Sequence, residues 1–161
     1  MRKKIKNKNL EEILSNAAHL GTYAMPGELT LAIIGARKEL KDAFETYTEA
    51  CKQIGEARCE RDENEKPITE FQKDEQGKDL INHPRKLKFK NVAVENAALD
   101  ELKKLGEQEV EIKLKEVSVA LIESLKNITP IQMEAITSLI EIKTLQPESN
   151  NVKMMSTNGV H

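Results

Sequence analysis

Apolar positions between residues 28 and 61 repeat at alternating spacings of four and three. The repeat begins at Leu29 and Ile33 and runs to Ala57 without an intervening proline. Such spacing puts one continuous apolar stripe on an α-helix of about nine turns. We therefore predict a long helix over residues 28–61 with a heptad seam formed by Ile33, Ala36, Leu40, Ala43, Tyr47, Ala50, Ile54 and Ala57.

Small side chains make up half of this seam, because every alternate seam position from residue 36 to residue 57 is alanine. An alanine row lets a second helix approach closely. Phe44 and Cys51 widen the stripe, which favours packing inside a globular domain over a bare two-stranded coiled coil. Leu31 and Ile34 lie off the seam, so we expect a second neighbour, such as the first helix, to cover them.

Three shorter helices are predicted around the long one. Residues 9–20 form an apolar stripe that ends before Gly21. Residues 92–106 resume helical spacing and are expected to return antiparallel along part of the alanine row, as a helical hairpin. Residues 130–143 form the last helix.

The last helix has the clearest start in the chain. Thr129, Pro130 and Gln132 match a capping box with proline at the first helical position. Ile128 and Met133 are spaced for a hydrophobic staple across this start. Pro147 is expected to follow its end.

Two segments carry a strand-like alternation of apolar and charged residues, namely residues 87–90 and 109–119. The second segment also fits a helical spacing, and its β-branched residues favour the strand. Its apolar positions change register after Leu114, which requires a bulge or bend. Its expected partner is either residues 87–90 or the Lys3–Lys6 region, since a strand needs a hydrogen-bonded neighbour.

These elements predict a mainly α fold, α+β at most, with a single domain over residues 1–147. The polar residues 148–161 are predicted to be a disordered tail. Aromatic residues make up 3% of the 161 positions. The core must therefore come from Leu, Ile, Val and Ala, which suits helix packing.

Charge and cysteine content predict a cytoplasmic protein. The net charge of −2 gives no general attraction to nucleic acid or to anionic lipid. The basic N-terminus has no apolar run behind it, and no segment has the roughly 18 apolar residues of a membrane span. Cys51 and Cys59 are too far apart on one helix for a disulfide, which suits a reducing compartment.

No group of residues predicts catalysis, a cofactor or a metal site. His19, His83 and His161 lie in different segments, and none has a second ligand at a convincing spacing. Cys51 lies beside the seam and Cys59 at the end of the long helix, where a core and a surface role are expected. The acidic run over residues 56–65 lacks the ligand pattern of a calcium loop. The chain is accordingly not expected to be an enzyme.

Two basic patches are the candidate interaction residues. Three interpretations remain open for them: solvated strand edges, a phosphate-binding face for nucleic acid if the two segments pair, or a surface for an acidic protein. The patches comprise Arg2, Lys3, Lys4 and Lys6, and Arg85, Lys86, Lys88 and Lys90.

The order of these elements resembles a family of small, uncharacterised helical proteins encoded by bacteriophages and prophages. The resemblance spans residues 3–142 and concerns the order of elements rather than a chemical motif. It implies a phage origin, expression in a bacterial cytoplasm and no known cofactor, and it gives no residue a catalytic role. The segments that carry it are KNKNLEEIL (6–14), DENEKP (62–67), LDELKKL (99–105), EVEIKL (109–114) and TPIQMEAI (129–136).

Three functions follow as hypotheses. The first is a non-enzymatic protein-binding module, for example an inhibitor of a host defence protein. The second is a virion or assembly accessory protein that self-associates through the heptad seam. The third is a nucleic-acid-binding accessory protein. The pattern leaves open whether the seam is covered within the chain, by a second copy or by a partner.

Overall fold

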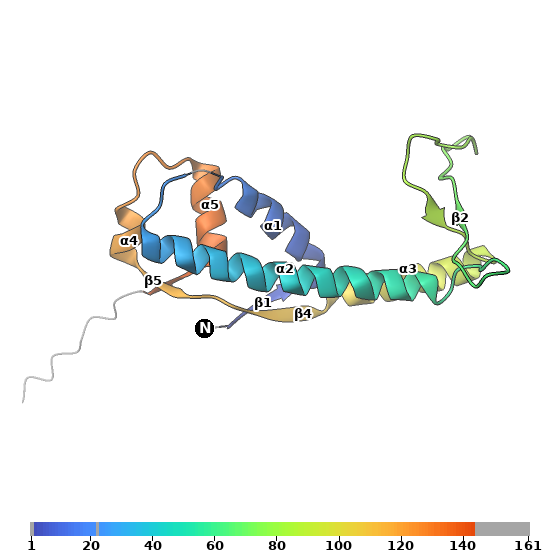
Figure 1. Ribbon diagram of the computed structural model, residues 1–161, viewed down its shortest axis with the longest axis horizontal. Helices are drawn as coiled ribbons and strands as arrows, with labels where there is room; N and C mark the ends of the chain where they lie inside the picture. Colours follow the sequence, from blue (N-terminus) through green and yellow to red (C-terminus); the bar gives the residue numbers. More distant parts are fainter. Residues whose placement is uncertain (1, 22, 144–161) are drawn as a thin grey trace, which may run out of the picture.

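Helix α2, Gly27–Glu56, is the spine of the fold. The computed structural model describes residues 2–21 and 23–143. Within it, the 30 residues of α2 lie along the long axis of the molecule (Figure 1), a length of about 45 Å at 1.5 Å per residue. The predicted start of the long helix is correct to one residue, but the helix ends at Glu56 rather than at Arg61.

Backbone pairing explains the early end of α2. The Glu60 N–H donates to the carbonyl oxygen of Lys88 at 2.8 Å, and Cys59 forms an antiparallel bridge with Phe89. A Cβ atom on Gly55 would lie 2.7 Å from Cδ1 of Leu87, so Leu87 packs directly on the end of the helix. The apolar spacing continues to Ala57. However, residues 88 and 89 pair with the backbone of residues 59 and 60, which therefore cannot continue the helix.

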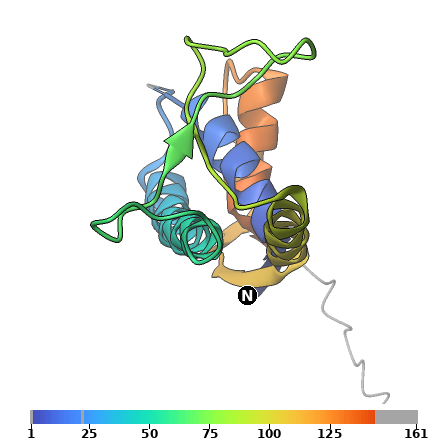
Figure 2. The same cartoon turned by 90° about the vertical axis from the view of Figure 1, so that its right-hand side faces the viewer.

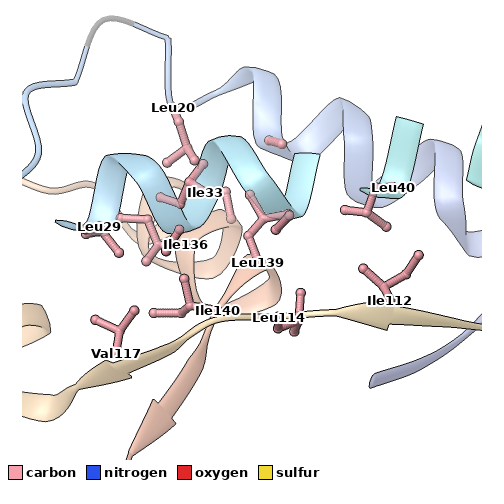
Figure 3. Packing of buried hydrophobic residues seen from close by; sticks show 14 of the residues in the cluster. Leu20, Leu29, Ile33, Leu40, Ile112, Leu114, Val117, Ile136, Leu139 and Ile140 are labelled. Carbon is pink, nitrogen blue, oxygen red and sulfur yellow. The ribbon is translucent and has the colours of Figure 1, made fainter. Parts of the chain in front are cut away.

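The core surrounds the first half of α2. Helices α1, Leu10–Ala18, and α5, Pro130–Leu139, contact each other and both contact α2. Side chains from α2, α5 and the segment after α1 converge between these elements and the strands below them (Figure 3). The largest fully buried side chains are Leu10, Leu29, Leu40, Ile112, Val117, Ile136 and Leu139.

Two small sheets form the layer beside this core. Strand β1, Arg2–Lys6, pairs antiparallel with β4, Glu109–Lys113, and a 3-10 turn η1, Asn7–Asn9, leads from β1 into α1. Strand β5, Glu116–Ser118, pairs in parallel with β6, Glu141–Lys143. The strand interpretation is therefore confirmed for residues 109–113 and 116–118. The Lys3–Lys6 region is the partner of the first part only, whereas the second part pairs with residues 141–143, which were predicted to be helical.

The predicted break in this strand is also present. Ile112 and Leu114 are buried, and so is Val117, which is out of alternation with them. The chain leaves strand geometry between β4 and β5, which allows all three side chains to enter the core. The strand does not continue to residue 119, because Ser118 accepts a hydrogen bond from the Leu121 N–H and starts helix α4, Val119–Glu123.

The end of the last predicted helix is wrong. Its start has the predicted capping box, in which Thr129 and Gln132 exchange backbone and side-chain hydrogen bonds. The helix ends at Leu139 rather than at residue 143, since Ile140 is extended and buried and the Glu141 N–H donates to the Lys115 carbonyl at 3.0 Å. Pro147 and the predicted tail at 148–161 lie outside the described residues.

Helix α3, Val92–Glu107, runs antiparallel to the second half of α2 and confirms the predicted hairpin. Asn91 caps it by accepting from the Val94 N–H. A Cβ atom on Gly106 would lie 3.4 Å from the hydroxyl of Tyr47, while Arg58 beyond α2 pairs with Glu101. Figure 2 views the molecule along its long axis, the direction of α2, and shows α2 and α3 side by side.

Residues 57–91, which we call the arm, project at the far end of α2 (Figure 1). Strands β2, Thr69–Glu70, and β3, Lys86–Leu87, pair antiparallel there. The predicted β element at 87–90 is thus shorter and begins one residue earlier. It pairs within the arm and not with residues 109–119. No residue of the arm is buried.

The seam is covered unevenly. Ile33, Ala36 and Leu40 are buried beneath α1, α5 and the strands, whereas residues 43–54 of the seam are half-buried beside α3. Ala57 is exposed and lies outside the helix. The heptad pattern therefore reflects packing within this chain along the first half of α2.

Candidate functional site

The first basic patch lies along β1, and acidic residues of the same chain neutralise part of it. Arg2 Nη1 is 3.1 Å from Glu111 Oε2, and Lys6 Nζ is 2.7 Å from Glu107 Oε2. Lys3 and Lys4 are exposed and have no ion-pair partner among residues 2–21 and 23–143.

The second basic patch lies in the arm and is paired in the same way. Lys86 contacts Glu95 at 3.0 Å and Glu70 at 3.5 Å, and Lys88 contacts Glu60 at 2.9 Å. These carboxylates raise the pKa values of both lysines above the usual value. The other two cations of this patch, Arg85 and Lys90, form no ion pair among the described residues.

Arg85 lies 4.7 Å from the centre of the Phe71 ring and donates to the Thr69 carbonyl. This is a cation–π geometry that fixes the guanidinium within the arm. Lys90, at the base of the arm, has no ion pair in the part of the chain that the structure describes.

The two patches do not form one surface. Residues 7–9 contact the C-terminal part of α3, whereas β3 precedes its N-terminus. The 16 residues of α3 separate these points by about 24 Å at 1.5 Å per residue. The two segments also pair with different strands, so the condition for a merged phosphate-binding face is not met.

The second half of the seam opens onto a groove between α2 and β4. It holds about 460 Å³, and Ala43, Tyr47 and Ala50 form part of its wall. Burial raises the pKa of Tyr47, and a hydrogen bond with the Cys51 side chain adds to the effect. The alanine row thus borders an open groove, with acidic residues along it at Glu39, Asp42, Glu109 and Glu111.

A second hollow lies between α1 and α2, on the first half of the long helix. Leu14 of α1 and Ile34 of α2 line it together with three cations, and it holds about 520 Å³. Leu31, one turn before Ile34, is 63% exposed, and Ile34 itself is 58% exposed. We call this hollow the α1–α2 notch; its lining residues are Leu14, Ile34, Arg37, Lys38 and Lys41.

The notch contradicts one expectation from the sequence. Leu31 and Ile34 were expected to be covered by the first helix, yet α1 crosses α2 obliquely and leaves both exposed (Figure 1). Their position off the seam was the signal that could have identified them. An apolar residue that no neighbour covers is a stronger indication of a binding surface than a lysine at a strand edge.

The candidate nucleophiles and ligands do not converge. His19 and His83 are exposed, and Cys51 and Cys59 are half-buried free thiols. Among the described residues, no three His, Cys, Asp or Glu side chains come together in a way that could hold a metal ion. His161 lies outside the described residues.

Comparison with known proteins gives no match: no family model, no curated protein and no solved structure is similar to this chain. Over residues 2–21 and 23–143, no helix has the length and apolar character needed to cross a membrane.

Proposed function

We propose that this chain is a non-enzymatic protein-binding protein whose partner contacts the exposed apolar face of α2. The observation that carries the proposal is the exposure of Leu31 and Ile34 on a long helix that is otherwise well packed at this end. Two large aliphatic side chains on one turn present apolar area that a partner can remove from water, at about 25 cal/mol per Å². A helix held by a core gives this face a fixed shape.

The origin and the partner are proposed on the resemblance to phage-encoded proteins. We infer that the chain acts in a bacterial cytoplasm and binds a host or phage protein. A host defence protein is one concrete target. Inhibition by contact alone would need a surface of fixed shape and no cofactor.

The alternative functions have less support. Self-association through the seam would use Ile33, Ala36 and Leu40, which α1, α5 and the strands already cover. Nucleic-acid binding would use the basic patches, where Arg2, Lys6, Lys86 and Lys88 already contact carboxylates. These alternatives would have to use the remaining residues: the half-buried second half of the seam for self-association, and Lys3, Lys4 and Lys90 for nucleic acid.

Affinity capture from a bacterial host lysate tests the proposal. The tagged wild-type protein is compared with a Leu31→Ser/Ile34→Ser variant and with a control, Val92→Ser/Leu99→Ser, which removes two apolar side chains that are also exposed, on α3. We expect the wild type and the control to retain the same partner and the Leu31/Ile34 variant to lose it. Equal retention by all three proteins, or no specific partner at all, would refute the proposal.

A further inference from the structure

We infer that the α1–α2 notch binds an amphipathic helical segment that carries acidic side chains beside its apolar face. The inference rests on the proposed function and specifies its partner. Three features of the notch support it: the arrangement of side chains along α2, the charge at the rim and the size of the apolar surface.

The exposed side chains follow one line along α2. Leu31, Ile34, Lys38 and Lys41 succeed one another at spacings of three, four and three, so they lie on the same helical face. The line covers about 15 Å of helix at 1.5 Å per residue. Leu14 of α1 forms the facing wall. A shallow groove about 15 Å long between two helices fits about three turns of a third helix. That helix would contact the groove through side chains at its i, i+3/i+4 and i+7 positions.

The positive charge at the rim of the notch favours an acidic partner. Arg37 and Lys38 have no ion-pair partner among the described residues. Lys41 lies 3.7 Å from Glu45, and both side chains are largely exposed, so this pair is weak. Among residues 2–21 and 23–143, no acidic side chain lines the notch. A segment with Glu or Asp on both sides of an apolar stripe would place its carboxylates against these cations.

The size of the surface favours a single helix over a second copy of the chain. A standard protein–protein interface covers roughly 800 Å² on each partner. The apolar surface here is smaller: it consists of Ile34 and the half-buried Leu14 in the notch, with the exposed Leu31 beside it. A membrane surface fits less well, because a recess between two helices keeps Leu14 away from a flat bilayer.

A direct binding assay tests the inference. A fluorescent helical peptide of about 18 residues, with leucine at i, i+3, i+4 and i+7 positions and glutamate beside them, is titrated with the full chain. The same peptide with lysine in place of glutamate is the matched ligand. We expect the acidic peptide to bind at least tenfold more tightly than the basic one, and this preference to weaken as salt is raised.

Two variants examine the two components of the notch. Arg37→Glu/Lys38→Glu should weaken binding of the acidic peptide at least tenfold and reverse the preference between peptides. Ile34→Ser should weaken the binding of both peptides. The control Lys103→Glu/Lys104→Glu makes the same charge change on exposed positions of α3 and should leave affinity unchanged. All substituted side chains are exposed, and circular dichroism verifies that each variant is folded.

Other outcomes would overturn the inference and point elsewhere. Light scattering that shows a dimer lost on Ile34→Ser would identify a second copy as the occupant. Binding to vesicles with anionic lipid that is lost in Arg37→Glu/Lys38→Glu, without peptide binding, would identify a membrane surface. If neither peptide binds while the capture experiment still gives a partner that depends on Leu31 and Ile34, the acidic-helix inference fails and the proposed function remains.

Discussion

A single carboxylate joins the first residues of the chain to the end of α3. Both oxygens of Glu107 accept hydrogen bonds from lysine ammonium groups, one from Lys6 at 2.7 Å and the other from Lys8. These two hydrogen bonds lower the pKa of Glu107 to about 2, from an ordinary value of 4.5. The carboxylate therefore links β1 and η1 to a helix about a hundred positions later in the sequence.

We expect the double substitution Lys6→Ala/Lys8→Ala to raise the pKa of Glu107 toward 4.5. Because the pKa is lowered in the folded state, the interaction stabilises the fold fully above the unfolded-state pKa. This contribution is lost as the pH falls from about 4.5 through about 2. A ¹³C NMR titration of the carboxyl groups measures the shift directly.

The control for this titration is Lys3→Ala/Lys4→Ala, which removes two charges from the same strand but breaks no ion pair with Glu107. It should leave the Glu107 midpoint near its wild-type value. A Glu107 midpoint that moves equally in both double variants would show that the general positive charge of the strand, rather than the two hydrogen bonds, sets the pKa.

Single-residue environments were predictable where periodicity alone decides them. Ile33, Ala36 and Leu40 are buried as seam residues should be. The exposure of Leu31 and Ile34 was not predictable in this way, because spacing gives the direction of a side chain but not the extent of its neighbour. Helix α1 has nine residues against thirty in α2, and it crosses the longer helix instead of following it.

At the scale of elements, starts were predicted better than ends. The capping box at Thr129 fixes the start of α5 because it is a local interaction within four residues. The ends of α2 and α5 depend on backbone partners from elsewhere, Lys88 and Lys115, which no local pattern contains. The choice between residues 87–90 and the Lys3–Lys6 region as partner of residues 109–119 stayed open for the same reason.

The arm contains two turns of the same design, at residues 62–66 and 74–78. In each turn the first residue, Asp62 or Asp74, accepts through Oδ1 from the backbone N–H groups two and four positions later. In each turn the fourth residue has a positive φ, which is 64° at Glu65 and 80° at Gly77. The left-handed conformation suits glycine and costs other residues about 1 kcal/mol.

We therefore predict that Glu65→Gly stabilises the first turn by about 1 kcal/mol. Hydrogen exchange of the Lys66 amide, which donates to Asp62, should slow about fivefold. The reciprocal change Gly77→Ala should speed exchange of the Lys78 amide by a similar factor. Unchanged or faster exchange at Lys66 in Glu65→Gly would mean that the loss of backbone entropy at glycine outweighs the relief of strain.

The whole molecule divides into a packed body and an arm held mainly by surface contacts. All the buried aliphatic side chains of the core cluster belong to residues 5–40 and 112–140, whereas residues 57–91 contain none. The arm is ordered by backbone pairing, its two turns and ion pairs such as that between Lys88 and Glu60. Local opening should therefore require much less free energy in the arm than in the body.

Removing most of the arm tests this division. Cys59 and Phe89 face each other in an antiparallel bridge, so residues 60–88 can be replaced by Asn-Gly, which forms a two-residue hairpin turn. We expect the shortened chain to unfold cooperatively with a midpoint within a few degrees of the wild type. The contacts with the helices that it loses are at the surface: that of Leu87 with Gly55 and the ion pair of Lys86 with Glu95. For comparison, Leu40→Ala in the intact chain should cost about 2–5 kcal/mol. A contrary result would be a loss of chemical-shift dispersion for residues of the body while circular dichroism still shows helix. The arm would then be required for the packing of the core, and the two parts would form one cooperative unit.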